Sequence, residues 1–138
     1  MSDRCIFCDA RDDTILYRGN DGTVILDDPI RTGHLLVGGP RHIAGLHQIS
    51  ETEAGALFSL AQRVSKQIVE QTGASKVYVA AVGDKDPHFH IHLFPKFVVD
   101  GNLGPYIFGA SGWAGNLAAV DTPDPTSFYA LLRSRLAD

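Results

Sequence analysis

The stretch DPHFHIHLFPKF, Asp86 to Phe97, holds three of the six histidines of the chain at alternate positions. Successive side chains of a β-strand point to opposite faces, so His88, His90 and His92 are predicted to line one face of a strand at intervals of about 6.8 Å. The apolar residues between them are expected to pack into a core behind that face. Because a row of imidazoles makes a poor core, the segment predicts a chemical role for this face.

The sequence around this stretch predicts an α+β domain on an antiparallel sheet of about five strands. Short apolar and β-branched runs between turn residues predict the strands, at residues 14–18, 23–27, 34–38, 76–82 and 88–94. A capping-box pattern at Ser50 and apolar residues at helical spacing predict one long helix that ends at Gly73. A C-terminal helix is expected to begin at Asp124 and Pro125, with a buried stripe formed by Phe128, Leu131, Leu132 and Leu136.

The composition predicts one domain over residues 1–138, because 138 residues with 44% hydrophobic and 20% charged residues can bury a core. The net charge of -4 argues against a broad basic surface for duplex nucleic acid. A small anionic ligand could still be held by imidazoles and backbone amides. We expect a cytoplasmic protein without membrane attachment, since no apolar run resembles a signal peptide or a transmembrane helix.

The only two cysteines, Cys5 and Cys8, form a C-x-x-C pair near the N-terminus. They precede every predicted strand, whereas a thioredoxin-like redox pair would follow one. A structural zinc ion takes four ligands, commonly thiolates and imidazoles, so this pair needs two more donors. His42 and His47 form an H-x4-H pair, but their distance along the chain from Cys8 is too long for a zinc finger. A site assembled from distant segments is the better expectation.

Three interpretations of the alternating histidines remain open from the residues alone. Imidazoles on one strand face can attack and transfer protons at a phosphorus or carbonyl centre. They can instead hold a catalytic metal, although such a site would need a further ligand and no acidic residue lies within the strand to complete it. The third interpretation is a solvated strand face.

The segments GHLLVGGPRH, Gly33–His42, and HFHIHLF, His88–Phe94, resemble the histidine triad superfamily, which is known for an H-φ-H-φ-H-φ-φ signature with φ apolar. The leading C-x-x-C, the glycine-histidine strand and the proline-basic-histidine turn occur in the same order as in its zinc-containing branch. The resemblance runs from Cys5 to about Phe97 and implies the fold of that superfamily. It does not cover residues 98–138, the Gly-rich stretch and the C-terminal helix.

The resemblance implies a nucleotide hydrolase or nucleotidyl transferase that cleaves at the α-phosphate of a nucleotide conjugate, a dinucleoside polyphosphate or a nucleoside phosphoramidate. His90 matches the middle histidine of the triad, the nucleophile that forms a covalent nucleotidyl-histidine. His92 and His34 match the remaining active-site histidines, which are expected to lie beside the phosphates. The alternative is a non-catalytic nucleotide-binding regulatory module of the same fold.

The resemblance also implies a structural zinc site. His88 matches the position that joins Cys5, Cys8 and a histidine such as His42 around zinc in metal-containing relatives. Such a Cys2His2 site would be closed and would tie the N-terminus to the sheet. Since the family is commonly dimeric, we expect a homodimer, with the long helix and the strand beside it at the two-fold interface.

Two departures from the family pattern concern substrate binding. The acidic or amide residue that binds a ribose hydroxyl in many relatives would fall on Leu26, so Asp27, its neighbour, is our expected ribose ligand although neighbouring strand residues face opposite sides. A polar run that touches phosphate in many relatives is replaced by GDKDP, residues 83–87. Lys85 is expected to supply a phosphate contact there. For both residues a solvated turn position is the alternative.

Overall fold

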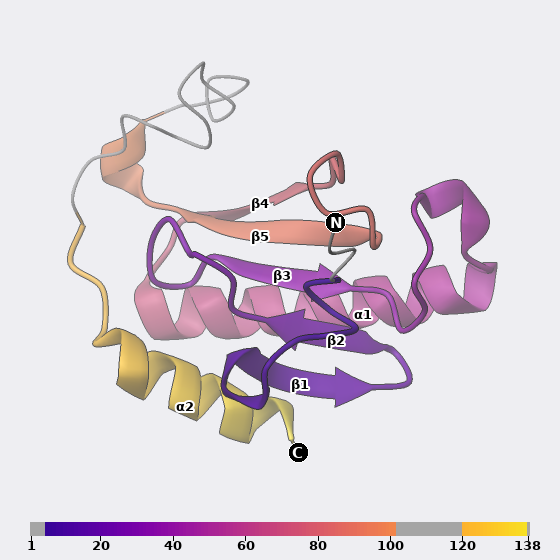
Figure 1. Cartoon of the computed structure of the whole chain (residues 1–138). Helices are drawn as coiled ribbons and strands as arrows, with labels where there is room; N and C mark the ends of the chain where they lie inside the picture. Colours follow the sequence, from indigo (N-terminus) through magenta and orange to yellow (C-terminus); the bar gives the residue numbers. More distant parts are fainter. Residues whose placement is uncertain (1–4, 102–119, 138) are drawn as a thin grey trace.

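The computed structural model describes residues 5–101 and 120–137 and contains a five-stranded antiparallel sheet with two α-helices (Figure 1). The strand order from edge to edge is β1-β2-β3-β5-β4. The strands are β1 (Ile15–Gly19), β2 (Gly22–Ile25), β3 (Leu35–Gly38), β4 (Lys76–Ala80) and β5 (His90–Lys96), and the helices are α1 (Glu51–Thr72) and α2 (Pro125–Leu136). The predicted α+β class, with one long helix and one C-terminal helix, is confirmed.

Helix α1 lies across one face of the sheet, behind the strands in the view of Figure 1. The Ser50 hydroxyl accepts the N–H of Glu53 at 3.0 Å and the Glu53 carboxylate accepts the N–H of Ser50 at 2.9 Å, which is the predicted capping box. Gly73 ends the helix in the left-handed conformation at φ 74°. The apolar residues predicted from helical spacing are its buried face: Leu57, Leu60, Ala61, Val64 and Ile68.

The triad segment alternates as predicted. Phe89, Ile91 and Leu93 are buried in the core that the sheet forms with α1 and α2. The predicted strand, residues 88–94, is displaced by two residues, because β5 begins at His90 and ends at Lys96. Phe89 instead pairs with the loop after β3: its N–H donates to the carbonyl of Ile43 at 2.6 Å and its carbonyl accepts the N–H of Gly39 at 3.2 Å.

The buried stripe of α2 differs from the prediction at one position. Leu131 is 38% exposed, whereas Tyr129 is buried with Phe128, Leu132 and Leu136. Compared with the prediction, the buried face of α2 is therefore turned about the helix axis, so that it includes Tyr129 and not Leu131. The Tyr129 hydroxyl bonds to the backbone of Gly33 and so turns this ring inward.

The opposite face of the sheet carries the N-terminal segment. Cys5 and Phe7 form a second buried cluster with Ile25 of β2 and Leu36 of β3. In Figure 1 this segment crosses in front of the strands, on the side away from α1. The even-numbered triad histidines point to this face because their odd-numbered neighbours point to the helices.

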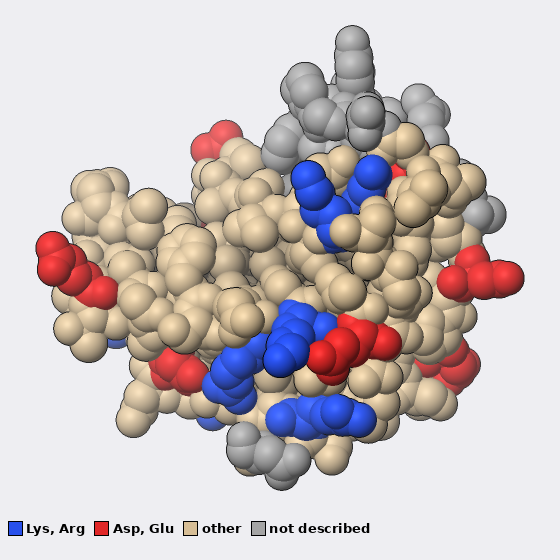
Figure 2. Space-filling view, turned by 180° about the vertical axis from the view of Figure 1, so that it is seen from behind, with Lys and Arg blue, Asp and Glu red and all other residues tan. Residues whose placement is uncertain are grey.

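The face covered by α1 carries charged groups of both signs. In Figure 2, which views the molecule from behind, Lys and Arg side chains gather in the lower middle with Asp and Glu side chains directly beside them. One pair of this kind joins Arg63 of α1 to Asp21 at 3.7 Å. None of the described helices combines the length and the apolar composition that crossing a bilayer requires.

Candidate functional site

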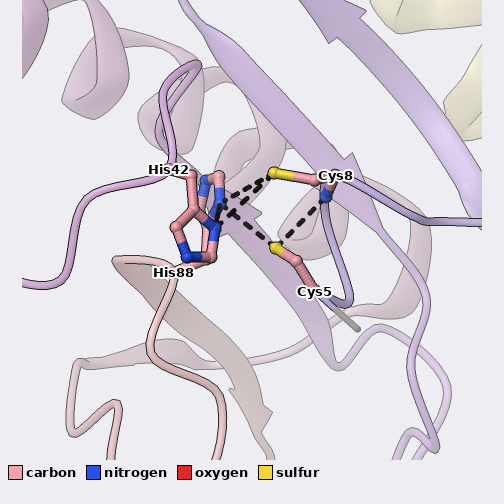
Figure 3. Close-up of side chains that lie close together, drawn as sticks. All are labelled: Cys5, Cys8, His42 and His88. Carbon is pink, nitrogen blue, oxygen red and sulfur yellow. Dashed lines mark hydrogen bonds between the residues drawn. The ribbon is translucent and has the colours of Figure 1, made fainter. Parts of the chain in front are cut away.

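Two cysteines and two histidines converge from three segments beside β3 and β5 (Figure 3). Cys5 and Cys8 come from the N-terminal turn, His42 from the loop after β3 and His88 from the residues just before β5. The Nδ1 atom of His88 lies 3.3 Å from Cys5 Sγ, 3.6 Å from Cys8 Sγ and 3.3 Å from His42 Nδ1. Cys8 Sγ lies 3.6 Å from His42 Nδ1. These are the four metal-binding residues expected from the sequence.

The geometry of these four side chains fits zinc. Donors bound to one tetrahedral zinc ion at about 2.0–2.3 Å lie roughly 3.3–3.8 Å from one another. The four donor atoms all lie within 4.8 Å of one another. The tautomer of His88 also fits, because its Nε2–H donates to the carbonyl of Gly39 at 2.7 Å and its Nδ1 lone pair is directed at the other donors. A backbone carbonyl on the far nitrogen is the usual support of a metal-binding histidine.

The surroundings of the two thiols suit binding of a metal cation. Cys5 Sγ accepts the N–H groups of Phe7 at 3.4 Å and of Cys8 at 3.2 Å, which stabilises negative charge on this sulfur. Burial, then the hydrogen bond and charge of Cys5, raise the pKa of the Cys8 thiol. A bound Zn²⁺ would deprotonate both thiols. The donor set therefore suits a structural zinc ion.

His90 lies next to this cluster and has a defined tautomer. Its Nδ1 lies 2.7 Å from the carbonyl oxygen of His88, and since a carbonyl only accepts, the proton must be on Nδ1. The lone pair of a neutral His90 is consequently on Nε2. The His90 side chain is buried, with 4% of the residue exposed. Its ring centroid lies 5.2 Å from that of His92, two residues on along the same face of β5.

His34 and His92 form a hydrogen-bonded pair. His34 Nε2 lies 3.1 Å from His92 Nδ1, and the N–H of Ile30 donates to His34 Nδ1 at 3.1 Å. In the neutral pair, the proton of His34 is therefore on Nε2 and the proton of His92 is on its own Nε2. Burial lowers the pKa of both imidazoles from 6.5 to about 4, and for His92 the charges of His34 and His90 add to this effect. Both rings are neutral at pH 7.

Asp27 lines a cleft of about 330 Å³ between the N-terminal segment and β2. Leu26 lines the same cleft. Burial, then the charges of Asp28 and Asp86, raise the pKa of Asp27, while Lys85 and His90 lower it. The cleft is lined by Cys5, Ile6, Asp9, Ala10, Arg11, Thr14, Ile25, Leu26 and Asp27.

The expected site residues thus fall into two adjoining groups. His34, His90 and His92 lie together, and Cys5, Cys8, His42 and His88 form the metal cluster. Among the described residues no other group of His, Cys, Asp or Glu is arranged to hold a metal ion. Within that part of the chain, His90 and His92 do not join His88 in a catalytic metal site, and His47 does not join His42.

Phe7 is a site residue that sequence reasoning missed. Its ring stacks on His88 at 4.8 Å between centroids and lies 5.5 Å from the ring of His90. A Cβ atom on Gly38 would lie 2.5 Å from the Phe7 ring, so this glycine makes the close approach possible. A buried aromatic residue between two metal-binding cysteines was the available signal, because metal ligation fixes the direction in which the intervening side chain points.

Comparisons with known proteins agree with this geometry. A protein-family model described as the HIT domain matches residues 10–99. A zinc-bound histidine triad family protein from Mycobacterium smegmatis superposes with a TM-score of 0.66 at 24% identity, covering 96% of this chain and 93% of that one. A hypothetical histidine triad nucleotide-binding protein from Sulfolobus tokodaii gives a TM-score of 0.58 at 19% identity, covering 89% and 80%.

A curated relative is the nitrilase and fragile histidine triad fusion protein NitFhit of Caenorhabditis elegans, which is 27% identical over 73 residues. The match covers 49% of this chain but only 17% of that protein. The solved structures, at these identities, establish the fold. The family assignment depends on the match over residues 10–99, which includes the histidines of the site: the chain belongs to the HIT domain family.

Proposed function

We propose that this protein is a nucleotide hydrolase or nucleotidyl transferase that cleaves at the α-phosphate of a nucleotide conjugate through a covalent nucleotidyl-His90. The observation that carries the proposal is the 2.7 Å hydrogen bond from His90 Nδ1–H to the carbonyl of His88. It puts the lone pair on Nε2 and keeps it there without a separate general base. The His34–His92 pair lies beside this ring.

In the first step, His90 Nε2 attacks the α-phosphorus, an N–P bond forms, and the bond from phosphorus to the leaving group breaks. The imidazole of the adduct carries a positive charge, which the carbonyl of His88 stabilises through the Nδ1–H bond. His92, whose ring centroid lies 5.2 Å from that of His90, supplies the leaving group's proton from its Nε2–H. His34 Nε2–H then passes its proton to His92 Nδ1 through their hydrogen bond, so that the pair is one proton short until the second step.

In the second step, water attacks the same phosphorus and the N–P bond breaks, which releases the mononucleotide and restores neutral His90. The proton that the water loses goes to the His34–His92 pair and restores both neutral rings. An acceptor other than water would make the protein a transferase. Two steps at one phosphorus replace a single difficult displacement. Neutral His34 and His92 suit this role, because each ring has one N–H to donate and one lone pair to accept.

The cleft beside Asp27 is the proposed place of the nucleoside. Its volume of about 330 Å³ is within the usual range of small-molecule sites. Asp27 would accept a ribose hydroxyl, and Lys85 would contact a phosphate oxygen. Asp27 itself lines this cleft, which supports the ribose role, and Lys85 belongs to the segment directly before the triad. The Sulfolobus tokodaii relative, described as nucleotide-binding, supports the same ligand class.

The zinc ion would be held by Cys5, Cys8, His42 and His88 and would crosslink three segments of the chain. Its chemistry there is structural, because four protein ligands leave no open coordination position. By fixing His88 it also fixes the carbonyl that orients His90.

Intact-mass spectrometry after brief exposure to adenylyl and guanylyl phosphoramidates and dinucleoside polyphosphates tests the function. We expect a nucleotidyl adduct or released mononucleotide with wild type and neither with His90→Ala. His47→Ala is the matched control, because it removes an exposed histidine outside both groups. A folded wild type that binds these compounds without adduct or release would favour the alternative, a non-catalytic nucleotide-binding module.

We also propose a homodimer through β4 and α1. Strand β4 lies at the edge of the sheet, and Val79 on it and Val69 on α1 are exposed by 56% and 40%. A cleft between these elements is lined by Gln62, Ser65, Lys66, Val69, Glu70 and Val77. Sedimentation at micromolar concentration is expected to give twice the monomer mass, and Val69→Glu with Val79→Lys to give the monomer. A monomeric wild type would refute the dimer.

A further inference from the structure

The turn between β2 and β3 that carries His34 holds the ring through its own backbone. The N–H of Ile30 donates to His34 Nδ1 at 3.1 Å, and the N–H of His34 donates to the carbonyl of Arg31 at 3.0 Å. The tautomer of His34 therefore depends on where the backbone of residues 30–34 lies. Of these two bonds, only the one from the Ile30 N–H reaches the ring. If this N–H moved away, the remaining backbone bond would not hold the proton of His34 on Nε2.

Helix α2 provides the first anchor of this turn. The hydroxyl of Tyr129 accepts the N–H of Gly33 at 3.0 Å, in a buried environment. Gly33 has a φ of +99°, and a Cβ atom there would lie 3.1 Å from Pro95 Cγ. The hydroxyl thus holds a glycine at positive φ, a conformation that other residues rarely adopt, directly next to His34.

A buried ion pair provides the second anchor. The Arg31 guanidinium bonds to both carboxylate oxygens of Asp100, at 2.7 and 3.2 Å, and to the carbonyl of Pro95 at 3.1 Å. It lies 5.6 Å from the ring centroid of Phe94 and 5.2 Å from that of Phe97. The two side chains are exposed by 8% and 0%. A buried bidentate pair with two aromatic rings beside the guanidinium fixes the position of Arg31.

Both anchors come from beyond the part of the chain that matches the HIT domain, which ends at residue 99. Asp100 follows that match directly, and Tyr129 belongs to the C-terminal helix. Burial alone would raise the pKa of Asp100, but hydrogen bonds from Arg31 and from the N–H of Phe97 hold it below its ordinary value, so the anchor is charged at pH 7.

The tautomer of His34 determines the tautomer of His92. His34 with its proton on Nε2 donates to His92 Nδ1, so His92 must carry its own proton on Nε2. The opposite tautomer of His34 would place a lone pair against His92 Nδ1, and His92 would then have to move its proton to Nδ1 to keep the hydrogen bond. His92 Nε2 would lose the proton that the leaving group needs.

We propose that Tyr129 and Asp100 are positioning residues that hold the turn of residues 30–34 and thereby fix the tautomers of His34 and His92. The effect on catalysis rests on the function proposed above, whereas the effect on the tautomers does not. A part of the chain outside the family match thus determines the protonation pattern of the site.

Long-range ¹H–¹⁵N correlation spectra of histidine-labelled protein test this inference in wild type and Tyr129→Phe, since they report which ring nitrogen is protonated. We expect His34 and His92 as Nε2–H tautomers in wild type and a second tautomer, or averaged shifts, for both in the variant. His88 and His90 are internal references, because carbonyls outside the turn hold their protons. With a phosphoramidate that wild type hydrolyses, Tyr129→Phe should lower kcat about tenfold, which is a fraction of what a general acid contributes. Its KM should stay within about twofold of the wild-type value.

Leu132→Val is the matched control, since it weakens the packing of the same helix but removes no hydrogen bond to the turn, and its tautomers should equal those of wild type. Asp100→Asn tests the other anchor and should change the same two histidines. Unchanged tautomers in both Tyr129→Phe and Asp100→Asn would overturn the inference even if activity fell. If wild type turns over no substrate, the proposed function fails, but the spectra still decide the positioning role.

Discussion

The carbonyl of His88 accepts the Nδ1–H of His90 at 2.7 Å, while the ring of His88 faces the two cysteines and His42. One residue therefore belongs to both groups of the site: its side chain to the metal cluster and its backbone to the proposed nucleophile. Phe7 adds a second link, because its ring contacts both histidines. Disturbing the metal cluster should disturb His90, although the two groups use different atoms.

Zinc content should follow the four ligands. Purified wild type is expected to contain one zinc ion per chain by mass spectrometry of the metal, and His42→Ala less, since three ligands bind zinc more weakly than four. His47→Ala, which removes the other histidine of the H-x4-H pair, should retain the full content. Equal zinc content in the two variants would contradict the assignment of His42.

Removal of zinc by a chelator should lower the free energy of unfolding, because binding to the folded state alone is linked to folding. Urea unfolding with and without chelator measures the difference. The same treatment should leave the stability of Cys8→Ser nearly unchanged, since that variant has already lost one thiolate. A chelator effect of equal size in both proteins would indicate a cause other than this cluster.

The contact between Gly38 and Phe7 predicts a coupled pair of mutations. Gly38→Ala should destabilise the protein by about 1–3 kcal/mol, since the added Cβ atom would lie 2.5 Å from the Phe7 ring. In the Phe7→Ala background the same change should cost less, with a coupling energy of about 0.5–3 kcal/mol from urea unfolding. Gly39→Ala is the control, because its added atom would meet only the carbonyl of Arg41, at 4.0 Å. Additive effects of the two mutations would contradict the packing.

Acid should weaken the fold through the His34–His92 pair. Burial lowers the pKa of both rings to about 4, below the ordinary 6.5, so the unfolded chain binds more protons between these values. The free energy of unfolding should fall as the pH drops from about 6.5 to about 4, by on the order of 3 kcal/mol for the first ring that protonates. Above pH 6.5 the pair should contribute no pH dependence.

Because the metal ligands also bind protons in this range, the measurement is a difference between two proteins. Urea unfolding across the pH range should show a smaller slope for His92→Gln than for wild type, since one of the two titrating rings is absent. The loss of zinc is common to both and cancels. Parallel curves would show that the buried pair does not titrate as proposed.

The two bidentate ion pairs among the described residues, Arg31–Asp100 and Arg41–Glu53, should contribute differently to the free energy of unfolding. Asp100→Ala leaves the Arg31 guanidinium buried without its carboxylate, and removing one partner of a buried pair costs about 3–5 kcal/mol. Arg41→Ala breaks the ion pair with Glu53, in which the arginine side chain is 55% exposed. Because water screens this pair, its loss should change the free energy of unfolding little. Equal losses in urea unfolding would contradict this difference in burial.

Several features of the fold could be predicted because they depend on local periodicity. The limits of α1 follow from the Ser50 cap and from Gly73, and its buried face follows from the helical spacing. The alternation of the triad segment predicted that Ile91 and its odd-numbered neighbours enter the core. The predictions of where β5 starts and of which α2 residues are buried were less accurate. Both depend on contacts with distant loops, as at Phe89 and Tyr129.

The sequence by itself determined the family, because the alternating histidines and the C-x-x-C pair are short local patterns, and through the family resemblance it identified the metal-binding residues and the three histidines of the site. Only the tertiary structure decided the tautomers, because the partner of each ring nitrogen is a distant side chain or a backbone group: Gly39 for His88, the His88 carbonyl for His90, and Ile30 and His92 for His34. It also decided that Phe7 packs against His88 and His90 and that the Tyr129 hydroxyl bonds to Gly33, next to His34. Hydrogen-bond direction depends on where folded backbone lies, and no spacing in the sequence records that.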